Sequence, residues 1–329
     1  MKSKIDLGAC AGYLQEFISF RPITVAVACV FIYSMAAFSA ARANQLCGRW
    51  DSIDVLGGEY RTNSNVWGGT PGEQCITAYQ NSTYFSVTHS THNSGGVAAY
   101  PFIYKGCHWG GCTSNSGMPV RAFEISTAPF VWSIDTNSAG GTWNAAYEAW
   151  FSKTGGTAPD AAELMIWINY AGGAGPAGSY QGIAAIGGYD WNVYFEDWTQ
   201  PGEPGWYYIA YKITSPVNYV NLDFSDFIMD AASRGFINFA WYLDNMEAGF
   251  EIWRDGEGLT SNSFLASVNE SAFSDTDFIS FADFAAQWLR TNCDGANNWC
   301  NGADYPPEDG MVNYDDMASF AQRWLSDAE

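Results

Sequence analysis

The sequence predicts a mainly β protein, a sandwich or barrel of short strands with one packed helix, followed by a small two-helix module. Aromatic residues make up 17% of the 329 residues, charged residues make up only 15%, and 34 residues are glycine. This composition is typical of many short strands joined by tight turns. Between about residues 44 and 269, runs rich in β-branched and aromatic residues alternate with Gly, Asn, Ser and Pro. After about residue 270, apolar residues recur with a helical period instead.

The first 43 residues have the pattern of an export signal. Lys2, Lys4 and Arg21 precede an apolar run over residues 23–40, and the Ala-Arg-Ala sequence of Ala41–Ala43 offers a small-residue cleavage site. The run is about as long as a membrane span requires, so an uncleaved anchor is the alternative. We expect cleavage after Ala43, a secreted or cell-surface protein and no later membrane contact. The expected division is a signal peptide over 1–43, a β domain over 44–269 and a helical tail over 270–329.

Charge and cysteine usage narrow the class of protein. The formal net charge of −21 argues against nucleic acid or an anionic membrane as a partner, because both are bound by basic surfaces. A neutral polysaccharide imposes no such requirement. Six cysteines follow the N-terminal segment, and an even number in an exported chain indicates disulfides. Proximity in sequence favours Cys47–Cys75, Cys107–Cys112 and Cys293–Cys300. A zinc site is the alternative, which the absence of any Cys-x-x-Cys pair disfavours.

The expected elements follow from periodicity. A helix is predicted over Leu222–Ser233, because Phe224, Phe227, Ile228 and Ala231 recur at i, i+3, i+4 and i+7. The strand-like runs have alternating or continuous apolar character and are bounded by turn residues. They cover residues 60–66, 84–87, 120–125, 130–134, 162–168, 191–194, 206–213 and 248–253.

Two of these strands carry a glutamate beside aromatic residues. In the strand over 162–168, Glu163, Met165 and Trp167 share one face, whereas the opposite face is wholly apolar. In the strand over 248–253, Glu251 and Trp253 likewise share a face. Two such strands in a concave sheet would oppose two carboxylates across a sugar-binding cleft, the arrangement that glycoside hydrolysis uses. The alternative is two ordinary carboxylates on a solvated sheet face.

The C-terminal tail contains an internal repeat with a 36-residue offset, and each copy predicts a short amphipathic helix. The first copy has Phe281, Phe284, Ala285, Trp288 and Leu289, and the second has Met317, Phe320, Ala321, Trp324 and Leu325. Two short helices of this kind would bury their apolar stripes against each other. Asp304, Asp309 and Asp316 surround Gly310 and are candidate calcium ligands, although Asp304 is one residue out of register. The alternative is an acidic helical pair with Asp at its caps. The tail resembles bacterial dockerin-like duplicated segments, which implies a scaffold or cell-surface partner.

Several independent motifs resemble glycoside hydrolase family 12, and together they cover about residues 45–268. The motifs of the N-terminal half are Cys47–Trp50, Asn65–Gly68, Gln74–Cys75, Tyr100–Cys112 and Met118–Val120. Glu163–Trp167 and Ala248–Trp253 resemble the two catalytic motifs of the family, in the same order. The resemblance implies a β-jelly-roll sandwich of the concanavalin-like class with one packed helix. It also implies a retaining endo-β-1,4-glucanase that acts on cellulose-like glucans.

The resemblance implies roles for individual residues. Glu163 would be the nucleophile and Glu251 the general acid and then the base, which requires Glu163 ionised while Glu251 is protonated. Glu148 stands where the family has an acidic residue, usually Asp, that hydrogen-bonds the nucleophile; its extra methylene changes its reach. The carboxyls of a retaining enzyme lie roughly 5–5.5 Å apart.

The substrate-binding residues expected from the resemblance and from strand parity are Asn65, Trp67, His108, Met165 and Trp167. An indole stacks on the apolar face of a pyranose, and an amide binds hydroxyl groups. The alternatives are a core position for Trp67, a structural hydrogen bond for His108 and core packing for Met165.

The leading hypothesis from sequence is a secreted retaining endo-β-1,4-glucanase that needs no cofactor for catalysis and carries a dockerin-like tail with a candidate Ca²⁺ site. Two alternatives are a non-catalytic glucan-binding sandwich and a scaffold-tethered surface protein whose tail defines its biology. The sequence leaves open whether cellulose, mixed-linkage glucan or xyloglucan is preferred.

Overall fold

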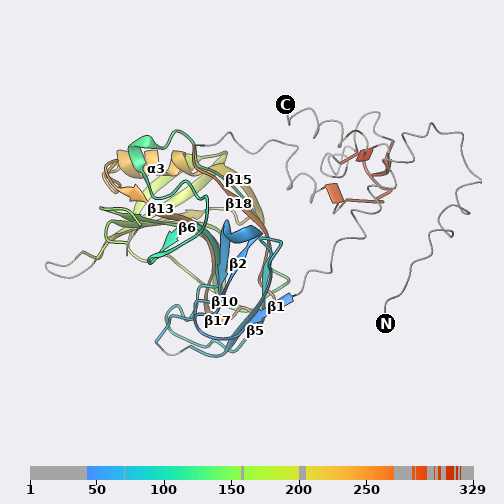
Figure 1. Cartoon of the computed structure of the whole chain (residues 1–329), viewed down its shortest axis with the longest axis horizontal. Helices are drawn as coiled ribbons and strands as arrows, with labels where there is room; N and C mark the ends of the chain where they lie inside the picture. The colour runs from blue at the N-terminus through green and yellow to red at the C-terminus, as the bar shows by residue number, and fades with distance from the viewer. Residues whose placement is uncertain are drawn as a thin grey trace, which may run out of the picture. The chain divides into compact units, whose positions relative to one another are not determined.

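The structure, a computed structural model, describes residues 43–69, 71–156, 159–199 and 205–269 and parts of 284–319. Most of these residues form two β-sheets (Figure 1). The smaller sheet has the order β1 (Ala43–Leu46), β4 (Gln74–Tyr79), β5 (Phe85–Ser90), β18 (Thr260–Ala266), β9 (Pro129–Asp135) and β15 (Tyr219–Asp223). The described part of the chain therefore forms a mainly β sandwich with one α-helix, as the sequence predicts.

The larger sheet carries the long strands. Its order is β12 (Ser179–Ile186), β13 (Tyr189–Asp197), β14 (Tyr207–Ile213), β11 (Ala162–Ala171), β10 (Gly141–Ser152), β17 (Asn245–Asp255), β6 (Phe102–His108), β3 (Tyr60–Asn63) and β2 (Ser52–Val55). Three short strands join it at one side: β16 (Tyr242–Leu243), β8 (Val120–Arg121) and β7 (Gly111–Cys112). The pair β11 and β14 is parallel, and the other described pairs are antiparallel. The central position of β10 brings the two glutamate-bearing strands to either side of it.

The core lies between the two sheets and is built from the inward faces of alternating strands. Tyr147 of β10 stacks on Phe130 of β9 with ring centroids 4.1 Å apart. Phe250 of β17 meets Phe85 of β5 edge to face, and all four side chains are fully buried. Leu164 and Ile166 of β11 belong to the same cluster. This face is wholly apolar because every second residue of each strand points to it.

Helix α3 (Phe224–Ser233) begins at Asp223, whose carboxylate accepts a hydrogen bond from the backbone of Ser225 and caps the helix. The predicted apolar stripe is the buried one, and the helix packs against β9 and β12. The prediction began two residues early, because Leu222 still belongs to β15. The predicted strand over 120–125 was wrong in its second half, where the chain turns into a short 3-10 helix, Ala122–Glu124; another 3-10 turn covers Leu56–Gly58.

The three predicted disulfides, Cys47–Cys75, Cys107–Cys112 and Cys293–Cys300, are all present. This pairing uses all six cysteines of the described residues, so none of these six is left to bind zinc. The Cys107–Cys112 bond closes the hairpin of β6 and β7.

The remaining predictions concern the two ends of the chain. Residues 1–42, which include almost all of the predicted signal, lie outside the described residues, as do most residues of the second predicted tail helix. In the first, Phe284 and Ala285 are helical, but residues 287–289 form a turn and Leu289 has a φ of +64°, so the predicted helix does not continue to Leu289. In the described part of the tail, Phe284, Ala303 and Val312 pack around the Cys293–Cys300 disulfide. Within the described ranges, no helix is both long and apolar enough to cross a bilayer.

Candidate active site

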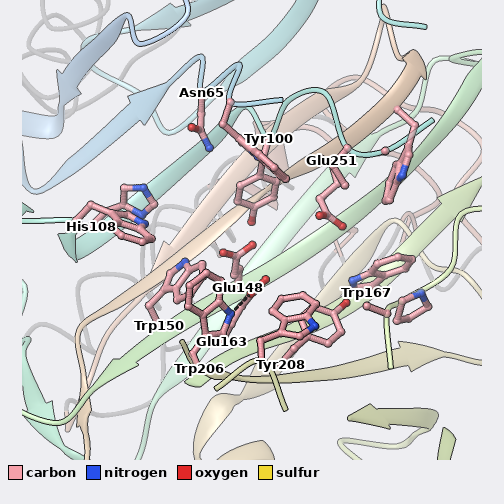
Figure 2. Close-up of a pocket in the computed structure, with 18 of the residues that line it drawn as sticks. Asn65, Tyr100, His108, Glu148, Trp150, Glu163, Trp167, Trp206, Tyr208 and Glu251 are labelled. Carbon is pink, nitrogen blue, oxygen red and sulfur yellow. Dashed lines mark hydrogen bonds between the residues drawn. The ribbon is translucent and has the colours of Figure 1, made fainter. Parts of the chain in front are cut away.

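The outward face of β10, β11 and β17 forms the floor of a cavity of about 810 Å³. Glu148 lies on the central strand, opposite Met165 of β11 on one side and Glu247 of β17 on the other. Glu163 pairs with Trp150 and Glu251 with Asn144, six positions apart along β10. The two predicted catalytic glutamates are therefore not neighbours in the ladder. Their side chains and that of Glu148 all reach into the same cavity from different strands (Figure 2).

Glu163 is almost fully buried, and its Oε2 accepts a hydrogen bond of 2.8 Å from the indole Nε1 of Trp206 (Figure 2). Burial raises the pKa of Glu163 to about 8, with a smaller contribution from the charge of Glu251. The hydrogen bond from Trp206 partly opposes this rise. An indole N–H can only donate, so it favours the ionised form of Glu163. The Trp206 bond reduces the rise in the pKa of Glu163 without reversing it.

Glu251 is partly exposed to the cavity and is held by Asn144. The Asn144 amide oxygen accepts a hydrogen bond from the backbone N–H of Glu251 (3.2 Å). This bond orients the amide so that Nδ2 of Asn144 donates to Oε2 of Glu251. Burial raises the pKa of Glu251 to about 7, and the bond from Asn144 opposes the rise. Because Oε2 already accepts a hydrogen bond, a proton on Glu251 is carried by Oε1. Between about pH 7 and 8, Glu163 and Glu251 together hold about one proton, which relieves their mutual repulsion.

Glu148 is the most enclosed of the three predicted catalytic residues, with 5% of its surface exposed. Burial, followed by the charges of Glu163, Glu247 and Glu251, raises its pKa well above the ordinary value. Among the described residues, no hydrogen bond joins its carboxyl group to that of Glu163.

Indoles form most of the remaining cavity surface. Eight of the fifteen tryptophans line it: Trp50, Trp67, Trp109, Trp150, Trp167, Trp198, Trp206 and Trp253. Trp206 is at the centre of one group, with edge-to-face contacts to Trp109, Trp150 and Trp198 at centroid distances of 5.2 to 6.5 Å. Flat, mostly apolar walls with few polar groups suit the faces of pyranose rings.

The structure brings four of the five predicted substrate-binding residues to the cavity: Asn65, Trp67, His108 and Trp167. Trp67 is 50% exposed, so it is not a core residue. Met165 is fully buried and does not line the cavity; it packs with Trp167 and Tyr208, which do line it. This placement matches the core-packing alternative for Met165.

Two residues of the site, Trp206 and Asn144, were missed from sequence, and a third, Glu247, was indicated only by its parity with Glu251. Trp206 reaches Glu163 across 43 positions, and Asn144 reaches Glu251 across 107. Glu247 forms a 2.6 Å contact with the Nδ1 of His108. The parity of β17, which places Glu247, Gly249 and Glu251 on one face, was the signal available for Glu247. For Trp206 and Asn144, no local pattern distinguishes them from other strand residues.

Two of the candidate calcium ligands of the tail, Asp304 and Asp316, accept hydrogen bonds from backbone N–H groups of nearby residues. The Asp304 carboxylate accepts the backbone N–H groups of Asp309 (3.2 Å) and Gly310 (2.9 Å). The Asp316 carboxylate accepts that of Asn313 at 2.8 Å. Among the described residues, no group of three or more His, Cys, Asp or Glu side chains is placed to bind a metal. Since residues 305–308 and Asp315 lie outside that description, a calcium site here stays a prediction.

A concave β-sheet with opposed buried carboxyl groups and an indole-lined cavity defines a glycoside hydrolase. The sequence profile of glycosyl hydrolase family 12 matches residues 58–269. The chain belongs to this family, whose endoglucanase members place it among the cellulase-type enzymes.

Similar proteins agree with this assignment. Endoglucanase S of Pectobacterium parmentieri is 30% identical over 256 residues, which are 73% of this chain and 91% of the relative. The endoglucanase cel12A structure from Rhodothermus marinus is 45% identical, with a TM-score of 0.65, and the match covers 69% of this chain and 99% of that one. A family 12 xyloglucanase structure from Bacillus licheniformis is 30% identical with a TM-score of 0.61, covering 69% of this chain and all of the other.

Proposed function

We propose that this protein is a secreted endo-β-1,4-glucanase that cleaves β-glucan with retention of the anomeric configuration. The observation that carries the proposal is the arrangement of Glu163 and Glu251 on separate strands, facing one indole-lined cavity that is large enough for several sugar rings. A non-catalytic glucan-binding sandwich would have no need for buried carboxyl groups that share a proton, because burying them costs stability.

In the first step, a carboxylate oxygen of Glu163 attacks the anomeric carbon and forms a glycosyl ester. The glycosidic C–O bond breaks, and the proton on Glu251 passes to the leaving oxygen. Esterification removes the charge of Glu163. Because that charge and the Glu251 charge repel each other, its removal favours ionised Glu251. Glu251 then takes a proton from water as the water oxygen attacks the anomeric carbon and releases Glu163.

The neighbouring residues have supporting roles. Trp206 donates its N–H to Glu163 and favours the attacking form. Asn144 holds Glu251 through one hydrogen bond to its carboxyl group and one from its backbone N–H, which leaves Oε1 to carry the proton. Glu148, whose pKa is raised, stays protonated beside Glu163 and adds no third charge to the floor.

Secretion is supported by the predicted export signal and by the three disulfides, which form and persist in oxidising compartments. A scaffold or cell-surface partner for the tail rests on the duplicated sequence of residues 270–329. The substrate is proposed to be a cellulose-like or mixed-linkage glucan or a xyloglucan.

The test is reducing-sugar release from carboxymethylcellulose, mixed-linkage glucan and xyloglucan, comparing wild type with Glu163→Gln. We expect the substitution to lower kcat by at least about 10³-fold, because an amide cannot act as the nucleophile. Glu73→Gln is the matched control, since the Glu73 side chain is 87% exposed and lies outside the cavity. NMR of the first product should show the retained anomer. A net inversion, or full activity of Glu163→Gln, would contradict the proposal.

A further inference from the structure

A fourth glutamate, Glu247, is buried next to Glu148 of the cavity floor, and the proposed double-displacement reaction does not use it. Glu247 is fully buried on the same face of β17 as Glu251. Its neighbours across the ladders are Glu148 of β10 and Tyr104 of β6. A carboxylate in such a position, beside three other carboxyl groups, is costly unless a positive group compensates it.

His108 supplies the contact that Glu247 has. The ring Nδ1 lies 2.6 Å from Oε1 of Glu247, a distance typical of a charge-assisted hydrogen bond. The second oxygen, Oε2, is buried and has no hydrogen-bond partner in the part of the chain that the structure describes. The His108 imidazole is therefore the one described group in contact with Glu247 that can compensate its negative charge.

His108 also borders the cavity, where 17% of its side chain is exposed. Among the described cavity-lining residues, it is the one side chain that can carry positive charge. Its ring packs against Phe102 and Tyr104 at centroid distances of 4.9 and 5.5 Å, so its plane is fixed by β6. With Nδ1 bound to Glu247, the other ring nitrogen, Nε2, is left for the cavity side.

The charged and titratable groups around this pair come from every strand packed against it. They are Glu148 of β10, Glu163 of β11, Glu251 of β17, Tyr104 of β6, the adjoining Tyr100 and Arg61 of β3. The guanidinium of Arg61 lies 3.5 Å from the Tyr104 hydroxyl and pairs with Asp54. Arg61 is thus separated from Glu247 by the Tyr104 ring. The glutamates face Glu247 directly, and only His108 opposes its charge.

We propose that Glu247 and His108 are positioning residues, a buried ion pair that holds a protonated imidazole at the cavity wall and cancels the Glu247 charge at Glu148 and Glu163. The inference rests on the proposed catalytic role of Glu163. The charge of Glu247 raises the pKa of Glu148 and of Glu163, and a positive imidazole beside Glu247 would oppose this rise. The pair keeps the nucleophile ionised at lower pH than an isolated Glu247 would allow.

The first test follows the imidazole itself, without any measurement of catalysis. The chain has three histidines, His89, His92 and His108, whose ring nitrogens can be followed by ¹⁵N NMR, with His108→Gln used for assignment. We expect the His108 ring to keep both protons at pH 7. His92, whose pKa burial lowers, is the neutral reference in the same spectra. A neutral His108 ring at pH 6 would overturn the ion pair and leave the proposed glucanase activity untouched.

The second test uses the pH dependence of kcat/KM on a soluble glucan. Glu247→Gln leaves the His108 imidazolium without its counter-charge and should move the acid limb to lower pH by about half a unit. His108→Gln leaves the Glu247 charge uncompensated and should move the limb to higher pH by a similar amount. The double variant should lie near wild type, because the pair is neutral overall. Glu247→Asp keeps the charge and should leave the limb in place while lowering kcat.

Two outcomes would overturn the proposal. A purely structural role predicts lower activity for both single variants without a shift of the limb, or with shifts in the same direction. If His108→Gln does not fold, Glu247→Gln decides alone: a limb that stays in place or moves to higher pH contradicts the proposal. If no variant and no wild-type sample is active, the proposed function fails, and the NMR measurement still decides whether the ion pair exists.

Discussion

The two faces of β10, β11 and β17 have opposite chemistry although they belong to the same strands. On the core face, Tyr147, Leu164 and Phe250 are fully buried among apolar neighbours. On the cavity face, a glutamate adjoins each of these residues in sequence: Glu148, Glu163 and Glu251. Burial of a large apolar side chain contributes about 1.5–3 kcal/mol, whereas burial of a carboxyl group among others costs stability. The core face therefore stabilises the fold. The cavity face lowers the stability, because it holds the buried carboxyl groups that the proposed reaction requires.

The largest effect should come from the core face. Phe250→Ala removes a ring that contacts Phe85 and Trp132, and it should lower the free energy of unfolding by about 3–5 kcal/mol. Glu251 is adjacent in sequence but points to the cavity, so KM at a temperature well below unfolding should change little. Calorimetry and kinetics on the same sample check this, with Phe250→Leu as the milder control. A large loss of kcat without a loss of stability would break the separation of the two faces.

An intermediate effect of the opposite sign is expected on the cavity face. The raised pKa of Glu148 means that the folded protein binds more protons than the unfolded chain above the ordinary glutamate range, so stability falls as pH rises through that window. Glu148→Gln removes this loss and should raise Tm by a few degrees, roughly 2–6 °C, at pH 8 but not at pH 4. Activity should fall at the same time. Glu73→Gln should show no such pH-dependent gain, and a lower Tm for Glu148→Gln at pH 8 would contradict the prediction.

The smallest effect concerns a single hydrogen bond. Trp206→Phe keeps an aromatic ring but removes the N–H that lowers the pKa of Glu163, so the pKa of this nucleophile should rise. The acid limb of kcat/KM should then move to higher pH by about 0.5–1 unit. Trp198→Phe is the matched control, because Trp198 contacts Trp206 but makes no hydrogen bond to Glu163. Equal shifts in both variants would attribute the effect to packing.

Local patterns account for what the sequence could predict. Alternation placed Glu163 and Glu251 on one face of their strands, and the 3.6-residue period located α3. What could not be predicted depends on contacts between distant segments. No local pattern shows that β10 separates β11 from β17, or that His108 meets Glu247, 139 positions away. The strand expected over 120–125 failed for a related reason, since the side chain of Glu124 bonds the backbone of Arg121 and favours a turn.

The hairpin closed by Cys107–Cys112 carries His108 and Trp109, so the disulfide lies directly beneath one wall of the cavity. Trp109 has a φ of +47°, a left-handed conformation that a large residue rarely adopts. A covalent link across five positions limits the conformations open to this segment before any sugar arrives. The entropy of ordering the wall is then lost during folding, and a glucan chain meets a preorganised surface. The Cys107–Cys112 disulfide is thereby expected to favour binding of the proposed substrate.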